Sequence, residues 1–275
     1  MIIGIDIGST TTKAISIENG KVTDCRTICL AVRAQDAVAA ATGAFGKIVL
    51  ENGIKINSIE KIVITGAGSS KIKDDIFGIP TSRVNEIEAI GIGGMFISGM
   101  RNIIITNIGT GTVIIEAGDN GIFHFGGSGV GGGTILGLAK KLLPIAEFND
   151  IIDLAKNGKL NQVDLLLGDI TDTSISFLNG ESTASNFGKM LDTASPGDIA
   201  FAIINMVYQV IGVLSVFAAR ARNSTSAVVT GNGSKNEIGK KVLTSITGMY
   251  GIDFIYPERA EYTTAIGAGL SGFLC

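Results

Sequence analysis

Hydrophobic residues at the start of the chain fall into short β-branched runs. The first run, residues 2–7, is dense in isoleucine, as a buried strand requires. A Gly-Ser-Thr break follows, and residues 10–17 resume a strand pattern. The Asn19-Gly20 pair is a strong hairpin signal before a third run over residues 21–31. The pattern therefore predicts three consecutive strands joined by tight turns.

After these strands the apolar residues recur mainly at the spacing of helices. Apolar residues at helical spacing predict helices at residues 34–51, 69–77 and 85–99, with a strand at 59–65. The Asn52-Gly53 pair ends the first of these helices. The first hundred residues thus read β-β-β-α-β-α-α.

A second round of the same organisation begins near residue 101. Strands are expected at residues 101–107, 113–117 and 122–125, again joined by glycine-containing turns. The remaining elements are helices at 134–143, 145–157, 186–191, 196–222, 237–249 and 262–273, strands at 227–230 and 253–256, and an exposed loop with a short strand at 164–185. The repeat predicts an α/β fold of two lobes, residues 1–100 and 101–275, meeting at a hinge.

One segment has the length and composition of a membrane span. Residues 199–219 carry no charge. Polar side chains nevertheless interrupt the segment, and Asp198 and Arg220 bracket it closely. We therefore expect the central helix of a large domain or a helix buried at a subunit interface.

The composition limits the kinds of partner and the cellular compartment that we expect for the protein. The 275 residues are 45% hydrophobic, with a net charge of −3 and no tryptophan, and no basic run suggests nucleic-acid binding. Cys25, Cys29 and Cys275 match no zinc spacing and are expected to be thiols in a reducing cytoplasm. The N-terminus lacks the basic region and cleavage site of a signal peptide.

The first hairpin carries the residue types of a nucleotide site. Asp6 stands before the turn, where it could hold a divalent cation through water, and Lys13 could add a charge to a phosphate. The turn at residues 8–10 can aim several backbone N–H groups at one anion. The alternative on residue types alone is an ordinary hairpin with a solvated Asp6.

Further glycine turns follow other predicted strands. They lie at residues 109–112 and 231–233, and a glycine run at 131–134 opens a helix. Phosphates bind at such places in open α/β sheets, because a side chain there would hold the backbone away from the ligand. Four such features together indicate a nucleotide site.

These motifs carry a family resemblance. G-I-D-I-G-S-T-T-T-K (4–13) and N-I-G-T-G-T (107–112) resemble the acetate-kinase, sugar-kinase, heat-shock-protein-70 and actin superfamily. Within it, the chain resembles the type II pantothenate kinases. The further matching stretches are N-E-I-E-A (85–89), G-G-S-G-V-G-G-G-T-I-L-G-L (126–138), I-I-D-L-A (151–155) and S-T-A-S-N-F-G (182–188). The resemblance implies a two-lobed, duplicated ribonuclease-H-like (actin-like ATPase) fold with β-β-β-α-β-α lobes.

The resemblance also implies an activity and an assembly. The family phosphorylates pantothenate with ATP and Mg²⁺, forming 4'-phosphopantothenate for coenzyme A biosynthesis. It acts on a small molecule, with no membrane or nucleic acid involved. A cytoplasmic homodimer is implied, for which residues 199–219 offer an interface helix.

The resemblance also implies a role for each residue that matches a position of the family's motifs. Asp6 would organise Mg²⁺ through water, and Glu86 falls on the general base. The phosphate-binding residues would be Gly8, Ser9, Thr10, Thr11, Thr12 and Lys13. The rest of the nucleotide would be lined by Thr110, Gly111, Gly132, Gly133, Thr134, Ile135, Leu136, Phe148, Gly231, Asn232 and Gly233. The acceptor would contact Glu86, His124 and Ser185. On residue type alone, Glu86 also reads as a helix-start carboxylate favoured by the helix dipole.

His124 departs from the family pattern. The family has an arginine there that contacts the carboxylate of pantothenate, and a neutral histidine donates only one hydrogen bond. Three explanations are therefore open: the carboxylate is bound more weakly, another cation such as Arg83 takes the place of the arginine, or the substrate is different. The alternative is a strand histidine with no role.

Other functions in the superfamily are alternatives. The motifs at 4–13 and 265–269 also resemble the activator ATPases of 2-hydroxyacyl-CoA dehydratases, which act on a protein partner. Those ATPases hold an iron–sulfur cluster through second-lobe cysteines, and Cys275 is the only cysteine of that lobe here. A redox-free ATPase switch and a kinase for a different small alcohol are the remaining alternatives.

Overall fold

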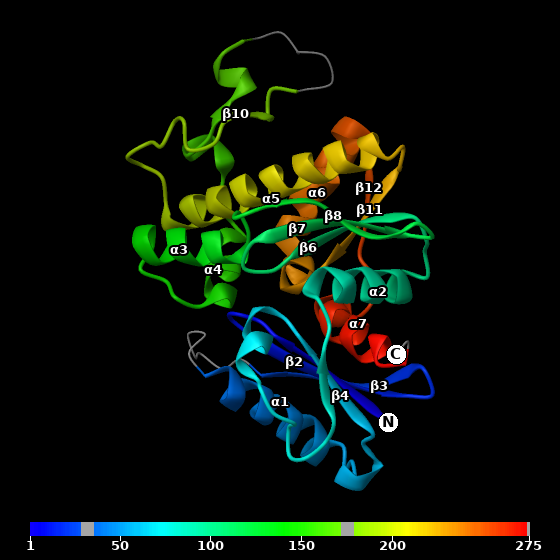
Figure 1. Ribbon diagram of the computed structural model, residues 1–275. Helices are drawn as coiled ribbons and strands as arrows, with labels where there is room; N and C mark the ends of the chain where they lie inside the picture. Colours follow the sequence, from blue (N-terminus) through cyan, green and yellow to red (C-terminus); the bar gives the residue numbers. More distant parts are fainter. Residues whose placement is uncertain (29–35, 172–178, 274–275) are drawn as a thin grey trace.

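Two five-stranded sheets of the same design organise the chain, one in each of two lobes (Figure 1). The computed structural model describes residues 1–28, 36–171 and 179–273. The first sheet has the strand order β3-β2-β1-β4-β5. Its strands are β1 (Ile2–Ile7), β2 (Thr12–Glu18), β3 (Lys21–Ile28), β4 (Lys61–Thr65) and β5 (Thr81–Arg83).

The second sheet repeats this plan in the order β12-β11-β6-β7-β8. Its strands are β6 (Ile103–Ile108), β7 (Thr112–Gly118), β8 (Gly121–Ser128), β11 (Ser226–Thr230) and β12 (Asp253–Ile255). The central strands β1 and β6 each have an antiparallel neighbour on one side and a parallel neighbour on the other. The predicted duplicated two-lobe α/β fold is confirmed.

Helices cover both faces of the first sheet. Helix α1 (Ala37–Glu51) buries Phe45 and Ile48 against Ile3, Ile5 and other residues of one face. Helix α7 (Thr263–Ser271) lies on the opposite face, so close that a Cβ on Gly4 would lie 2.2 Å from the carbonyl oxygen of Ala265. The C-terminal helix therefore returns to the first lobe.

Helix α2 (Glu86–Ser98) packs on the second sheet and also on α7 (Figure 1). The pair α2 and α7 thus lies between the lobes. The division at residue 100 separates the two sheets, while each of these helices packs against the sheet of the other segment. A boundary at that residue stays a prediction.

Four more helices pack around the second sheet. They are α3 (Gly132–Leu142), α4 (Phe148–Ala155), α5 (Pro196–Ala221) and α6 (Glu237–Tyr250). Ser195 and Asp198 cap the start of α5 with reciprocal hydrogen bonds, and Pro196 stands in its first turn. By length and composition α5 could cross a membrane, but 61% of its most apolar window is buried. We assign it as a core helix.

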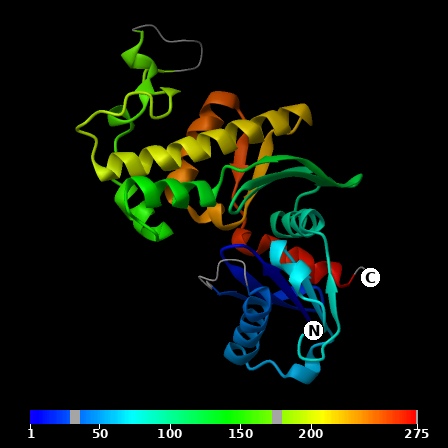
Figure 2. The same cartoon turned by 60° about the vertical axis from the view of Figure 1, so that its left-hand side comes forward.

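A segment between α4 and α5 projects from the second lobe (Figures 1 and 2). It contains β9 (Leu165–Leu166) and β10 (Thr183–Ser185). Buried Asp164 anchors it by accepting hydrogen bonds from Asn205 of α5 (3.0 Å) and from the backbone N–H of Phe187 (2.9 Å).

Two predicted helices are wrong. At 69–77 the structure has only a short 3₁₀ turn, η2 (Ala67–Lys71), because the backbone becomes extended at Ile72, with φ −85° and ψ 115°. At 186–191 no helix forms, since Phe187 has a φ of 59° and its N–H bonds to Asp164. The short strand β5 was not predicted.

Some predictions fall on residues outside the described ranges. The end of the third predicted strand, Cys29 and Cys275 are among them. Cys25 is a free, partly buried thiol, as expected, and burial raises its pKa to about 11.

Candidate active site

The first glycine turn joins β1 to β2 at the edge that faces the second lobe. The N–H of Gly8 donates to the carbonyl oxygen of Thr11 at 3.1 Å, which closes the turn. A Cβ on Gly8 would lie 2.8 Å from that oxygen, so this position requires glycine. The residues between them are therefore held in one tight loop.

Three glycine turns that are far apart in sequence meet across the lobes. The hydroxyls of Ser9 and Thr110 lie 2.6 Å apart, and Thr10 lies 3.4 Å from the same Thr110 oxygen. The side-chain amide of Asn232 donates to Thr11 at 3.0 Å. The structure thus brings the turns at residues 8–12, 109–112 and 231–233 to one place, as the nucleotide prediction requires.

The start of α3 packs directly under the second turn. The N–H groups of Gly132 and Gly133 donate to the carbonyl oxygens of Gly109 and Thr110, each at 2.9 Å. The Thr134 hydroxyl accepts from the N–H of Gly131 at 3.1 Å and so caps the helix. These contacts fix the glycine run against the turn.

Two carboxylates and a lysine occupy the base of the first turn. Asp6, the second-last residue of β1, is buried, and Lys13 lies opposite it in the β1–β2 register. Burial raises the pKa of Asp6, while the charge of Lys13 opposes the rise. Glu86 begins α2 and is solvent-accessible. Partial desolvation and then the Asp6 carboxylate raise the pKa of Glu86, again against Lys13.

The charge balance at this base fits a divalent cation. One lysine opposes two carboxylates, and the buried hydroxyl of Thr65, opposite Asp6 in the β1–β4 register, has no hydrogen-bond partner among the described residues. Within those residues, no group of three or more His, Cys, Asp or Glu could hold a metal. This composition suits Mg²⁺, which is held by one or two carboxylates together with water and substrate phosphates.

The structure places other predicted site residues differently. Ile135 is buried in the second-lobe core, and Phe148 packs against that core at the start of α4. His124 is exposed on β8, opposite Ile115 in register, and Ile115 packs in one cluster with Ile90 of α2. Ser185 lies in the projecting segment, far from the first turn (Figure 1).

The turn after β4 joins the site and was not predicted to do so. A Cβ on Gly66 would lie 2.5 Å from Oδ1 of Asp6, and one on Gly68 would lie 2.4 Å from the side chain of Ile7. The signal was present, because the letters T-G-A-G-S at 65–69 nearly repeat T-G-N-G-S at 230–234.

Comparison of the sequence with known proteins indicates one family. The pattern of the Fumble family matches residues 100–270. A type II pantothenate kinase of Bacillus cereus (strain G9842) is 34% identical over 222 residues, which cover 77% of this chain and 81% of that protein. The chain belongs to the type II pantothenate kinase family. A type II pantothenate kinase of Staphylococcus aureus (strain USA300) is 29% identical and covers 76% of the chain and 82% of that protein.

Solved structures confirm the fold of this pantothenate kinase family member. The activator of the 2-hydroxyisocaproyl-CoA dehydratase from Clostridium difficile with bound ADPNP has a TM-score of 0.69 at 19% identity, covering 99% of this chain and 94% of that one. A ROK family glucokinase from Streptomyces griseus in complex with glucose and AMPPNP has a TM-score of 0.61 at 14% identity, covering 98% and 97%. At these identities the likeness concerns the fold alone.

Proposed function

We propose that the protein transfers the γ-phosphoryl group of ATP to pantothenate and forms 4'-phosphopantothenate. The observation that carries the proposal is the meeting of the glycine turns at residues 8–12, 109–112 and 231–233 beside buried Asp6, in a chain of the type II pantothenate kinase family. Mg²⁺ would be held by Asp6 through water and by the phosphates, and would neutralise charge on the transferred group.

Each residue group has one task in this reaction. The N–H groups of the turn at residues 8–12 hold the β and γ phosphates, while the turns at 109–112 and 231–233 hold the rest of the nucleotide. Glu86 accepts the proton of the acceptor hydroxyl. A new bond forms from that oxygen to the γ phosphorus, and the bond to ADP breaks.

The raised pKa of Glu86 suits a general base. A base works best when its pKa lies near the operating pH, and here desolvation and the Asp6 carboxylate both move the pKa upward. The helix start that carries Glu86 is capped by Asn85, whose side chain accepts from the N–H of Ile87 at 2.8 Å. The base therefore stands on a fixed element.

The first experiment is ADP release from ATP and Mg²⁺ with and without pantothenate, with mass spectrometry of the product. We expect turnover that depends on pantothenate and a product of the mass of phosphopantothenate. ADP release at the same rate without pantothenate would instead indicate an ATPase switch. ATP binding with no turnover on pantothenate would direct the search to other small alcohols.

Glu86→Gln tests the assigned base. We expect kcat to fall roughly 10²- to 10⁴-fold, the usual contribution of a general base, with ADPNP binding unchanged. Glu88→Gln, two residues along the same helix at another exposed carboxylate, is the matched control and should keep full activity. Turnover of Glu86→Gln within a few-fold of wild type would exclude Glu86 as the base.

A cytoplasmic homodimer is part of the proposal. The family resemblance implies a dimer, and α5 has an outward apolar stripe that supports it. Pantothenate is a small polar molecule, and the composition offers no surface for nucleic acid.

A further inference from the structure

Asp6 in the first lobe has a counterpart in the second lobe, Asn107. Each is followed by Ile-Gly, which closes the central strand of its sheet and opens the glycine turn. Thr65 pairs with Asp6 in the parallel β1–β4 register, and Thr230 pairs with Asn107 in the parallel β6–β11 register. The same pair of positions therefore occurs once in each lobe.

The turn that follows the threonine is repeated as well. A Thr-Gly-X-Gly-Ser sequence begins at each threonine, and Gly66 and Gly231 have φ angles of 85° and 80°. A Cβ on Gly66 would lie 2.5 Å from Oδ1 of Asp6, and one on Gly231 would lie 2.9 Å from Oδ1 of Asn107. The two polar side chains therefore lie against their turns in the same way.

The hydrogen bond within the pair differs between the lobes. In the second lobe the hydroxyl of Thr230 donates to Oδ1 of Asn107 at 3.0 Å. In the first lobe the hydroxyl of Thr65 is buried and has no hydrogen-bond partner among the described residues. A buried hydroxyl without a partner costs stability, so its presence beside a carboxylate calls for a physical reason.

The residue on the other side of each pair also differs. Lys13 lies opposite Asp6 in the β1–β2 register, whereas Val113 lies opposite Asn107 in the β6–β7 register. The charge of Lys13 acts on Asp6 and favours its ionised form. The first lobe thus has a carboxylate and a lysine where the second lobe has an amide and a valine.

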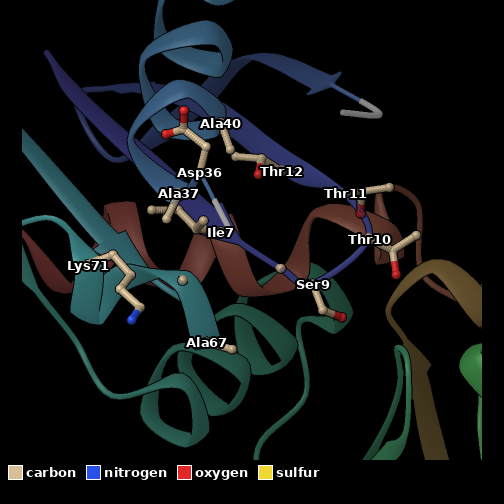
Figure 3. A pocket seen from close by; sticks show the side chains of 12 residues that line it. Ile7, Ser9, Thr10, Thr11, Thr12, Asp36, Ala37, Ala40, Ala67 and Lys71 are labelled. Carbon is tan, nitrogen blue, oxygen red and sulfur yellow. The ribbon is translucent and has the colours of Figure 1, made fainter. Parts of the chain in front are cut away.

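The pair faces the side of the sheet on which α2 and α7 lie. Side chains alternate along a strand, and Gly4, two residues before Asp6, packs against α7. Ile7 points the other way, where it lines a cavity of about 160 Å³ beside Lys71, under α1 (Figure 3). Asp6 and its threonine partner are therefore on the side of Glu86, away from that cavity.

We infer that Thr65 is a positioning residue, whose hydroxyl donates to the carboxylate of Asp6 when Mg²⁺ and nucleotide are bound, as Thr230 donates to Asn107. The inference rests on the proposed kinase function, which assigns Asp6 to Mg²⁺ and Lys13 to the phosphates. Lys13 turns to the phosphates, and Thr65 then supports the carboxylate. Adjacent strands lie about 4.8 Å apart, so rotation about one side-chain torsion brings the hydroxyl to Asp6. Such a hydrogen bond fixes the orientation of a carboxylate that serves a metal.

The first measurement is the binding of ADPNP to the full chain by calorimetry, with Mg²⁺ and with EDTA. Thr65→Val removes the hydroxyl and keeps the shape of the side chain. We expect the Kd for ADPNP to rise roughly tenfold with Mg²⁺, as when a hydrogen bond to a metal ligand is lost, and to equal that of wild type with EDTA. Thr65→Ser keeps a hydroxyl and should bind within twofold of wild type under both conditions.

The second measurement is urea unfolding without nucleotide or metal. Thr65→Val should unfold at the same urea concentration as wild type or a higher one, because it removes a buried hydroxyl that has no partner. Thr230→Val is the matched control and should unfold at a lower concentration, because it deprives Asn107 of a hydrogen bond. A merely structural role for Thr65 would lower its midpoint as well.

Three results would overturn the inference. They are binding of Mg²⁺ and ADPNP by Thr65→Val as tight as by wild type, the same loss of affinity in Thr65→Ser, and a midpoint of Thr65→Val as low as that of Thr230→Val. A wild type that binds ADPNP no more tightly with Mg²⁺ than with EDTA would refute the metal site and the inference together. Mg²⁺-dependent binding without turnover on pantothenate would refute the kinase alone, and the loss of affinity in Thr65→Val would still support the role of Thr65.

Discussion

Asp6 and Glu86 stand at the base of one turn, and the charge of Asp6 affects the ionisation of Glu86. The burial of Asp6 raises its pKa, and its charge in turn raises the pKa of Glu86. Lys13 opposes both shifts but is a single charge. The two carboxylates therefore outnumber the lysine, which favours a bound cation, and the pKa of Glu86 is raised above its ordinary value.

Asp6→Asn tests this coupling through the pH dependence of stability. A carboxyl whose folded pKa is raised stabilises the fold fully below its unfolded value, here 3.8, and that contribution is lost as pH rises through the folded value. Asparagine cannot ionise, so the variant should become more stable relative to wild type as pH rises through that window. Urea unfolding between about pH 4 and pH 8 measures it.

The control for this prediction is an exposed carboxylate. Asp74→Asn lies outside the turn and should show the same pH dependence as wild type. A constant difference in unfolding free energy between Asp6→Asn and wild type at all pH values would show that Asp6 does not titrate as described.

His124→Arg tests whether the arginine charge that the family has at this position limits pantothenate binding here. Arginine offers a charged pair of hydrogen bonds to a carboxylate where neutral histidine donates one, so we expect the KM for pantothenate to fall roughly fivefold, worth about 1 kcal/mol. An unchanged KM would mean that the carboxylate does not bind beside β8. Steady-state kinetics decide it, with His124→Ala to show whether any effect comes from the added charge.

At the scale of elements, the contact between α2 and α7 depends on missing side chains. A Cβ on Gly267 would lie 1.7 Å from the carbonyl oxygen of Ala89, and one on Gly93 would lie 2.0 Å from that of Thr263. Glycines at the crossing let the two backbones touch, and α2 carries Glu86 at its start. The position of Glu86, the proposed base, therefore depends on this helix pair.

Gly267→Ala should destabilise the protein by about 3 kcal/mol, because backbone on both sides must move. Gly248→Ala in α6 is the matched control, since a Cβ there would meet nothing within 4 Å. That variant should gain about 0.5–1 kcal/mol from helix propensity. Chemical denaturation measures both, and equal effects of the two substitutions would contradict this account of the crossing.

At the scale of the molecule, α5 leaves an apolar stripe uncovered. The stripe follows a helical spacing of four, three and four residues and consists of Met206, Val210, Val213 and Phe217. The first three side chains are partly exposed, and Phe217 is 58% exposed. Such a stripe on a long core helix is a surface on which two copies can pack.

Phe217→Asp should convert the proposed dimer to a monomer, because Phe217 is the most exposed side chain of the stripe and a charge buried there in an apolar interface is left without a partner. Sedimentation at micromolar concentration measures the mass. Phe77→Asp, at a side chain 65% exposed in the first lobe, is the control and should not change it. A wild-type monomer would remove the dimer from the proposal.

The sequence by itself determined the parts that depend on local pattern. The isoleucine runs, the Asn-Gly turns and the cap of α5 specify their elements within a few residues, and the two strand-turn-strand motifs predict the duplicated fold. It also predicted that Asp6 and the glycine turns form a site, since glycine turns at strand ends converge in this architecture, whereas Glu86 was assigned only through the family resemblance. Local pattern failed at 69–77, where the backbone becomes extended at Ile72, and at 186–191, where the positive φ of Phe187 interrupts the helix.

Only the tertiary structure decided what depends on distant partners. The pKa of Glu86 depends on Asp6, eighty residues away, and the return of α7 to the first lobe depends on backbone contact through Gly4. A cavity lies beside Lys71 because α1 faces the turn at residues 65–69 with alanines, whereas α5 faces the similar turn at residues 230–234 with Tyr208. Packing across the fold sets these features, and no single stretch of sequence carries them.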